Sequence, residues 1–243
     1  MVDTKDFLKA SLKAGKDLLS PPLADSPADG MERPAPLMVP IRSLGANHRD
    51  RIASHLKMLD DRDRYLRFGF AANDEQIQRY VDGLDFERDE IFGIYNRKIE
   101  LIAMAHLAFA AQPGHEACAE FGVSVLSTAR GRGYGARLFD RAMMHARNEG
   151  ISLMFVHVLS ENTAMLKIAR NAGATVERDG AESQACLRMP PATLDSRMTE
   201  IVEEHLAQTD YRLKLQAKQF WSFLSTVQGI RKGAQEAQQK VPM

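Results

Sequence analysis

The segment Arg130-Gly131-Arg132-Gly133-Tyr134-Gly135 combines three alternating glycines with two arginines, which suits it to holding a phosphate. A strand-like run over residues 119–126 precedes this segment, and a helix-like run over residues 136–148 follows it. Glycine has no Cβ, so a ligand can approach the main chain closely. The following helix directs its unpaired N–H groups and the positive end of its dipole at an anion. The sequence therefore predicts a phosphate-binding loop at a strand-to-helix junction.

Two kinds of protein place a glycine loop at such a junction. Read from Gly131, the segment gives G-x-G-x-x-A, a permitted form of the dinucleotide fingerprint, which starts directly after a strand and needs a later acidic residue. Here residues 127–130 intervene, and Glu161 comes late after the next strand-like run. Read from Arg130, the segment is R-x-x-G-x-G and resembles the acyl-CoA pyrophosphate loop of the GNAT N-acetyltransferase superfamily. We favour the second interpretation, and within it a similarity to bacterial protein-acetylating GNATs.

A second segment, residues 162–173, supports the same resemblance. It is similar to the GNAT segment in which an asparagine, here Asn162, opens a helix that ends at a glycine, here Gly173. Asparagine is a common helix N-cap and glycine a common residue after the last helical turn. The resemblance covers roughly residues 38–190 and implies an α/β fold, with a mixed, mostly antiparallel sheet and helices on both faces.

The elements that must position these segments follow the same order along the chain. The apolar periodicity and the turn signals predict β-α-α-β-β-β-α-β-α-β-β. Helices are expected over residues 47–59, 73–84, 136–148 and 162–172, and strands over 37–42, 90–95, 100–110, 118–126, 152–158, 174–178 and 184–188.

The resemblance also implies where an acyl-CoA would lie. The strand before the loop would expose backbone groups to the pantetheine amides, the loop would hold the pyrophosphate, and Asn162 would border the site. The implied strand residues are Val123, Val125 and Leu126, and the implied loop residues are Arg130, Gly131, Arg132, Gly133, Tyr134, Gly135 and Ala136.

Acyl transfer to an amine requires a base, because an alkylammonium with a pKa of about 10 is not nucleophilic at neutral pH. Glu120 is the leading candidate, because several protein-acetylating GNATs carry a glutamate base at this position of the strand. Its neighbours are apolar, and an apolar setting makes a carboxylate a stronger base. The alternatives are that Glu120 faces water, that Glu116 serves instead, or that His106 faces the acceptor rather than the core.

The charged stretch of residues 60–68 has two interpretations. Dense mixed charge is typical of a solvated face. A loosely similar stretch borders the acceptor site in protein-acetylating GNATs, which makes Tyr65 and Arg67 candidate lining residues.

One departure from the family concerns proton donation to the leaving thiolate. Many GNATs carry a tyrosine where this chain has Ala169, and an aromatic residue where it has Ala174. Beside the dinucleotide-binding alternative, a nicotinamide or flavin protein, the sequence therefore leaves two hypotheses within this resemblance. The first is an acetyl-CoA-dependent N-acyltransferase acting on a protein lysine or a small amine, and the second is a non-catalytic CoA-binding module that recruits a partner.

The composition is that of an ordinary globular protein, with 44% hydrophobic and 26% charged residues among 243. Lys and Arg number 32, as do Asp and Glu, so global charge gives no reason to invoke nucleic acid or a membrane. Cys118 and Cys186 lack metal-ligand spacing, and no metal is expected. Neither a secretory signal nor an apolar run of membrane-spanning length is evident, which favours the cytoplasm.

Two extensions flank the predicted GNAT domain, which we place at residues 37–190. Residues 1–36 contain a weak helical stripe and then a proline-rich linker. Residues 191–243 contain a long amphipathic helix, expected over 194–227, whose apolar stripe predicts self-association or a protein partner. The stripe comprises Leu194, Met198, Ile201, Leu206, Leu213, Phe220 and Leu224, with Trp221 beside it.

Overall fold

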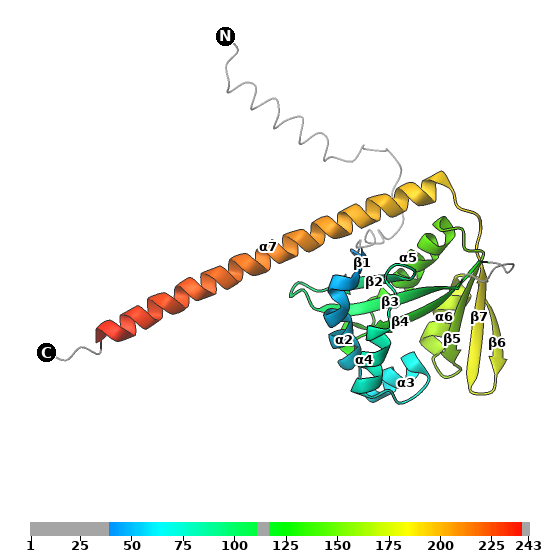
Figure 1. Ribbon diagram of the computed structural model, residues 1–243, viewed down its shortest axis with the longest axis horizontal. Coiled ribbons are helices and arrows are strands. Elements are labelled where there is room, and N and C mark those ends of the chain that lie inside the picture. The colour runs from blue at the N-terminus through cyan, green and yellow to red at the C-terminus, as the bar shows by residue number, and fades with distance from the viewer. Residues whose placement is uncertain (1–38, 111–116, 240–243) are drawn as a thin grey trace, which may run out of the picture. The chain divides into compact units, whose positions relative to one another are not determined.

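The computed structural model describes residues 39–110 and 117–239, with side chains described up to residue 219 (Figure 1). These residues belong to one compact unit. The predicted N-terminal appendage, the alternative base Glu116 and the side chains of Phe220, Trp221 and Leu224 lie outside the described part. The predicted domain boundaries therefore stay predictions.

The described strands form a seven-stranded sheet in the order β1-β2-β3-β4-β5-β7-β6 (Figure 1). Only β4 and β5 are parallel, and every other neighbouring pair is antiparallel. This mixed, mostly antiparallel sheet confirms the predicted fold class. The strands are β1 (Arg42–Ser43), β2 (Glu90–Tyr95), β3 (Leu101–Ala110), β4 (Cys118–Val125), β5 (Leu153–Leu159), β6 (Thr175–Asp179) and β7 (Glu182–Arg188).

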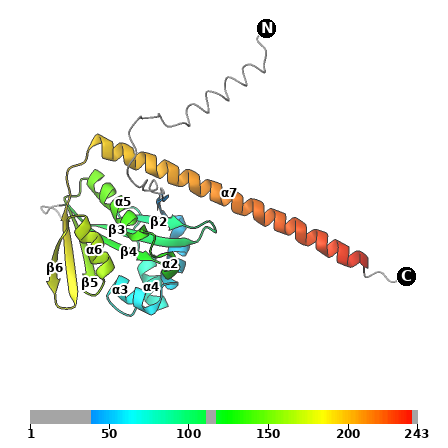
Figure 2. The ribbon, with the colours of Figure 1, turned by 180° about the vertical axis from the view of Figure 1, so that it is seen from behind.

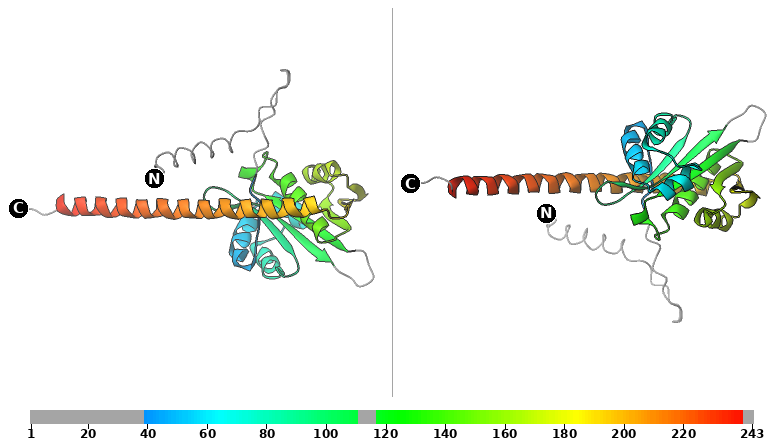
Figure 3. Two further views of the ribbon diagram at one scale, coloured as in Figure 1. Left: turned by 90° about the horizontal axis from the view of Figure 1, so that it is seen from above. Right: turned by 90° about the horizontal axis from the view of Figure 1, so that it is seen from below.

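Helices cover both faces of the sheet (Figures 2 and 3). One face packs against α2 (Arg49–Lys57) and α4 (Asp74–Asp82), and the other against α5 (Tyr134–Asn148) and α6 (Thr163–Asn171). Each face has its own apolar core, because alternate residues of a strand point to opposite sides.

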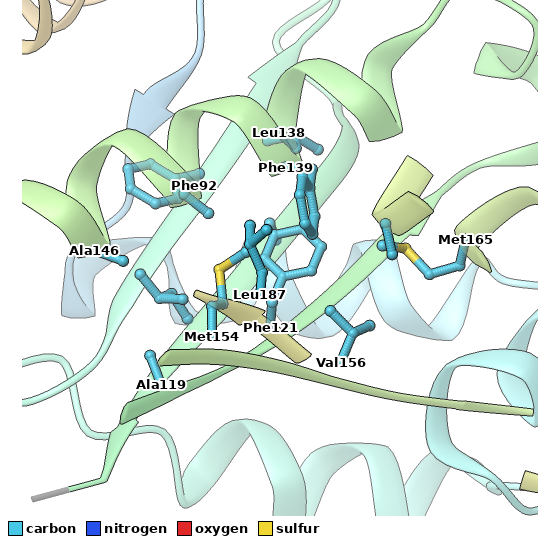
Figure 4. Close-up of a cluster of buried hydrophobic side chains, with 14 of the residues drawn as sticks. Phe92, Ala119, Phe121, Leu138, Phe139, Ala146, Met154, Val156, Met165 and Leu187 are labelled. Carbon is cyan, nitrogen blue, oxygen red and sulfur yellow. The ribbon is translucent and has the colours of Figure 1, made fainter. Parts of the chain in front are cut away.

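The core under α5 contains the largest buried aromatic side chains (Figure 4). Phe121 of β4 meets Phe139 of α5 edge to face, with ring centroids 5.0 Å apart. Burying one such side chain stabilises the fold by about 1.5–3 kcal/mol. This packing fixes the start of α5, and with it the glycine loop, against β4.

Two elements of the domain differ from the sequence-based prediction, and the C-terminal helix ends at Gln239 rather than at residue 227. The strand expected over 37–42 is only the two-residue β1, and residues 37–38 lie outside the described part. The charged stretch forms an additional helix, α3 (Asp61–Phe68), which the prediction missed. Its ends follow local rules: the Asp60 side chain accepts from the Asp63 N–H, and Gly69 has a φ of 81°. The density of charge obscured these capping signals.

The long C-terminal helix α7 (Leu194–Gln239) docks on α5 through polar side chains. Glu204 pairs with the buried Arg141 at 3.2 Å, and Glu200 contacts both Asn148 and His145 at 2.6 Å. Burial alone would lower the pKa of His145, but the hydrogen bond and the negative charge of Glu200 raise it above its usual value.

The apolar stripe of α7 stays largely exposed, because the α7 residues that meet α5 are mainly polar, while Tyr211 and Leu215 farther along the helix pack against the core on the α2 side of the sheet. Its exposed members are Leu194, Met198, Ile201, Leu206 and Leu213, and the neighbouring Val202 is exposed as well. The predicted interface through this stripe therefore stays a prediction. None of the helices in the described ranges combines the length and apolar character that a membrane span requires.

Candidate functional site

Strands β4 and β5 separate part-way along their length. They pair from Cys118↔Leu153 to Glu120↔Phe155, and beyond this point no register is shared, although β4 continues to Val125. A cavity of about 380 Å³ occupies this region, with Gly122 and Val123 on one wall and Val156 and Val158 on the other. The divergence leaves one edge of β4 without a strand partner along its second half.

The backbone of β4 shows which groups remain at that open edge. The Leu126 N–H donates to the Ile102 carbonyl at 3.0 Å, and the Leu126 carbonyl accepts from the Ala129 N–H at 2.8 Å. Successive strand residues direct their backbone groups to opposite edges, so those of Val123 and Val125 point away from β3, toward the opening. The prediction that Leu126 offers free backbone groups is wrong, whereas Val123 and Val125 remain candidates.

The predicted glycine loop leads into the N-terminus of α5. Gly131 and Gly133 both have a φ of 75°, a conformation that strains residues carrying a Cβ. Gly133 is the N-cap, yet α5 has neither a side-chain cap nor an acidic residue in its first turn. In contrast, α4 carries a complete capping box and two acidic residues at its start. The N-terminus of α5 therefore suits an external anion.

The remaining loop residues differ in their surroundings. Gly135 lies where an added Cβ would come within 3.4 Å of Ile168 in α6, so its small size permits close helix packing. Arg130 pairs with the buried Asp63 and therefore ties the loop to α3. Arg132 is exposed, whereas Tyr134 and Ala136 are half-buried.

Asn162 is the N-cap of α6, as predicted from its residue type, and also lines the cavity. Its side chain accepts from the Met165 N–H at 3.2 Å. Ala169, at the position of the usual family tyrosine, is buried in the core under α5. No hydroxyl is therefore supplied from that helix position.

Glu120 lies in the cavity wall but not in the predicted apolar setting. Its side chain is 59% exposed and lies 3.3 Å from Nδ1 of His157. Ala119 and Phe121 point to the opposite face of the sheet, into the core under α5, because neighbours along a strand alternate. The apolar setting predicted for Glu120 is therefore wrong, and its role as a base stays a prediction.

Next to Gly122, the cavity is lined by side chains from several elements. The Arg67 guanidinium of α3 lies against Gly122, where an added Cβ would come within 2.7 Å. Arg67 donates to the Tyr80 hydroxyl of α4 at 3.0 Å, and that oxygen lies 2.8 Å from Nδ1 of His106 in β3. Nε2 of His106 lies 3.0 Å from Oδ2 of Asp89. Arg67 was a predicted lining residue, whereas Tyr65 is not among the cavity residues.

The sequence-based reasoning did not find Tyr80 or Asp89. Burial alone would raise the pKa of Asp89, but hydrogen bonds from Arg88 and His106 lower it. Burial, with a contribution from Arg67, lowers the pKa of His106. At neutral pH the pair is therefore a carboxylate and a neutral imidazole, and His106 faces the cavity rather than an apolar core.

A second histidine, His55, contacts β4 from helix α2. His55 of α2 is fully buried and contacts the Ser124 hydroxyl through Nε2 at 2.8 Å and the Leu101 carbonyl through Nδ1 at 2.9 Å. Burial lowers the pKa of His55 to about 4. The side chain therefore links β3 and β4 as a neutral imidazole.

Comparison with known protein families supports the predicted resemblance. Residues 56–174 match the acetyltransferase (GNAT) family. The chain carries a GNAT acetyltransferase domain. The predicted resemblance and the N-acetyltransferase class are thus confirmed, and CoA-type thioesters are the donors that this family uses. No curated protein matches the chain.

Solved structures share the GNAT fold. The GNAT domain of PAT from S. lividans is 21% identical with a TM-score of 0.53, over 64% of this chain and 96% of that one. Spermidine N-acetyltransferase from Vibrio cholerae, in complex with CoA and spermine, is 15% identical with a TM-score of 0.50, over 63% and 96%. Ribosomal-protein-alanine N-acetyltransferase from Brucella melitensis is 14% identical with a TM-score of 0.50, over 61% and 99%. At these identities the likeness shows the fold alone.

Within the described ranges, no group of three or more His, Cys, Asp or Glu side chains is arranged to hold a metal ion.

Proposed function

We propose that the protein transfers an acetyl group from acetyl-CoA directly to an amine in a ternary complex. The observation that carries this proposal is the open edge of β4 beside the uncapped start of α5. An extended thioester arm can pair with the backbone of Val123 and Val125 while its pyrophosphate meets the loop from Arg130 to Ala136. Backbone N–H groups at a helix N-terminus suit a diphosphate.

The acceptor amine would enter at the cavity wall that carries Glu120. This carboxylate is exposed and negatively charged, so it can attract an ammonium group and accept its first proton, directly or through water. Its exposure also makes it reachable by a lysine side chain of another protein. We therefore place a protein lysine ahead of a small amine.

The experiment compares Glu120→Gln with Glu177→Gln, a matched change at an exposed position of β6 outside the cavity. If Glu120 is the base, kcat at neutral pH should fall roughly 10²- to 10⁴-fold with unchanged acetyl-CoA affinity. Transfer is measured with a panel of amines and lysine peptides. An unchanged kcat in Glu120→Gln would reassign the proton to another group.

The second candidate function is a CoA-binding module without catalysis, favoured by the absence of a hydroxyl at Ala169. It predicts tight acetyl-CoA binding with no amine-dependent release of the CoA thiol. A thiol-release assay on the full chain separates the two functions.

The exposed stripe of α7 supports a further proposal, self-association in the cytoplasm. Apolar patches of this extent usually mark an interface. The double substitution Ile201→Lys and Val202→Lys should lower the molar mass measured by light scattering, while Arg212→Ala, a change at an exposed polar position of the same helix, should not. A monomer in all three proteins would exclude self-association and leave partner recruitment.

A further inference from the structure

A continuous line of hydrogen bonds runs from the cavity into the sheet. It joins Arg67, Tyr80, His106 and Asp89 through contacts of 3.0, 2.8 and 3.0 Å. Arg67, Tyr80 and His106 line the cavity, while the Asp89 side chain is only 4% exposed. A buried carboxylate behind an imidazole and a hydroxyl at the cavity surface form an arrangement that can move a proton.

The partners of Asp89 fix the direction of each bond. An ionised carboxylate can only accept, and Asp89 accepts from the Phe109 N–H at 3.2 Å and from Arg88 at 2.9 Å. Nε2 of His106 must therefore carry its proton and donate it to Asp89. With a neutral ring, Nδ1 is an acceptor and takes the hydrogen bond of the Tyr80 hydroxyl.

Because the Tyr80 hydroxyl donates its proton to His106, the Tyr80 oxygen can act only as an acceptor toward the cavity. Its proton points to His106, and one lone pair of its oxygen receives the Arg67 N–H. The second lone pair is open to a donor such as a nitrogen that carries a proton. The groups that act on His106 are Asp89 and Glu120, which favour its protonation, and Arg67, which opposes it. That balance suits a transient proton carrier.

We propose that Tyr80 is a catalytic residue that takes a proton from the acceptor nitrogen and returns it to the departing sulfur. His106 and Asp89 are positioning residues that share this proton. The proposal rests on the proposed N-acetyl transfer and supplies the hydroxyl that Ala169 lacks. No local pattern in the sequence singles out Tyr80.

An ammonium loses two protons on becoming an amide, and Glu120 passes the first to solvent before the C–N bond forms. As the nitrogen lone pair bonds to the acyl carbon, the π pair of the C=O bond moves to the carbonyl oxygen. The second proton then moves to the Tyr80 oxygen while the Tyr80 proton moves to Nδ1 of His106. When the oxygen pair restores the C=O bond, the C–S bond breaks, its electron pair stays on sulfur, and the proton returns through Tyr80 to that sulfur. One proton is released overall, and the protein ends as it began.

The test is Tyr80→Phe, which removes the hydroxyl but keeps the ring that packs edge to face on Phe68 at 5.4 Å. We expect kcat to fall roughly 10²-fold, with the KM for acetyl-CoA and the melting temperature unchanged. Tyr65→Phe, on α3 but outside the cavity lining, is the matched control and should keep full activity. Asp89→Asn should lower kcat and change its dependence on pH, because the ring of His106 would lose its anionic acceptor.

A second acceptor separates this role from that of Glu120. Methoxyamine is already neutral at pH 7, so it should restore turnover in Glu120→Gln but not in Tyr80→Phe. Full activity of Tyr80→Phe beside a slow Glu120→Gln would overturn the relay alone. A wild-type protein that binds acetyl-CoA but acetylates no amine would overturn the proposed function together with the role of Tyr80.

The tautomer of His106 provides a measurement that is independent of turnover. Nitrogen-15 NMR of histidine-labelled protein should show a proton on Nε2, and the Nδ1 resonance should shift in Tyr80→Phe. A proton on Nδ1 instead would reverse the Tyr80 hydrogen bond and overturn the relay.

Discussion

The two sides of the cavity are built by different means. The proposed donor side consists of consecutive backbone, from the open edge of β4 through the glycine loop to the start of α5. The proposed acceptor side consists of side chains that α3, α4, β3 and the residues before β2 bring together. A site made of consecutive backbone depends on the positions of glycines in the sequence, whereas a site made of side chains depends on how distant segments of the chain pack together.

The largest effect is expected from substitutions in the glycine loop, and it should be confined to acetyl-CoA binding. Gly133→Ala places a Cβ on a residue with a φ of 75°, which costs about 1–2 kcal/mol and should move the N–H groups that we propose as the pyrophosphate site. Calorimetry should show that acetyl-CoA affinity falls by about 100-fold. Gly135→Val, which would meet Ile168, should act in the same way.

Gly150→Ala is the matched control, because Gly150 has a φ of 80° at the other end of α5. It should lose similar stability and keep its affinity for acetyl-CoA. Equal affinities in Gly133→Ala and Gly150→Ala would remove the loop from the donor site.

A smaller effect should appear when the acceptor side is disturbed. Gly122→Ala forces the Arg67 guanidinium away, because the new Cβ would lie 2.7 Å from it. Losing the Arg67 hydrogen bond to Tyr80 should lower kcat about 10-fold and leave acetyl-CoA affinity unchanged. Gly45→Ala, which meets only Asn47 at 3.6 Å, should change neither. A loss of donor affinity in Gly122→Ala would show that the two sides are not separate.

The smallest effect tests whether the donor site depends on side chains at all. Arg132→Ala removes an exposed charge, so acetyl-CoA affinity should fall by no more than about fivefold. Arg178→Ala, an exposed arginine on β6, is the control. A 100-fold loss in Arg132→Ala would make this a side-chain site and erase the contrast between the two sides.

The difference between a site made of backbone and a site made of side chains also explains which features the sequence predicted and which it did not. The loop and Asn162 were predictable because their signals, glycine spacing and a capping residue, are local. The setting of Glu120 was not, because the prediction counted adjacent strand residues as surroundings although they face the other side of the sheet. Tyr80, His106 and Asp89 meet across chain separations of 17 and 26 residues, which no local pattern reports. For α7, the apolar period predicted the helix, but not a docking face that combines polar contacts to the buried Arg141 and Asn148 with the packing of Tyr211.

The buried His55 makes folding a proton-linked reaction. The folded protein keeps this imidazole neutral down to about pH 4, whereas the unfolded chain takes up a proton near pH 6.5. Stability from this group is therefore complete above pH 6.5 and falls as the pH drops toward 4, by about 3 kcal/mol in all. His145 has the opposite sign: its raised pKa gives stability that is present below pH 6.5 and lost as the pH rises through the folded value. A falling pH therefore destabilises the fold through His55, which contacts β4. A rising pH destabilises it through His145, which lies on α5.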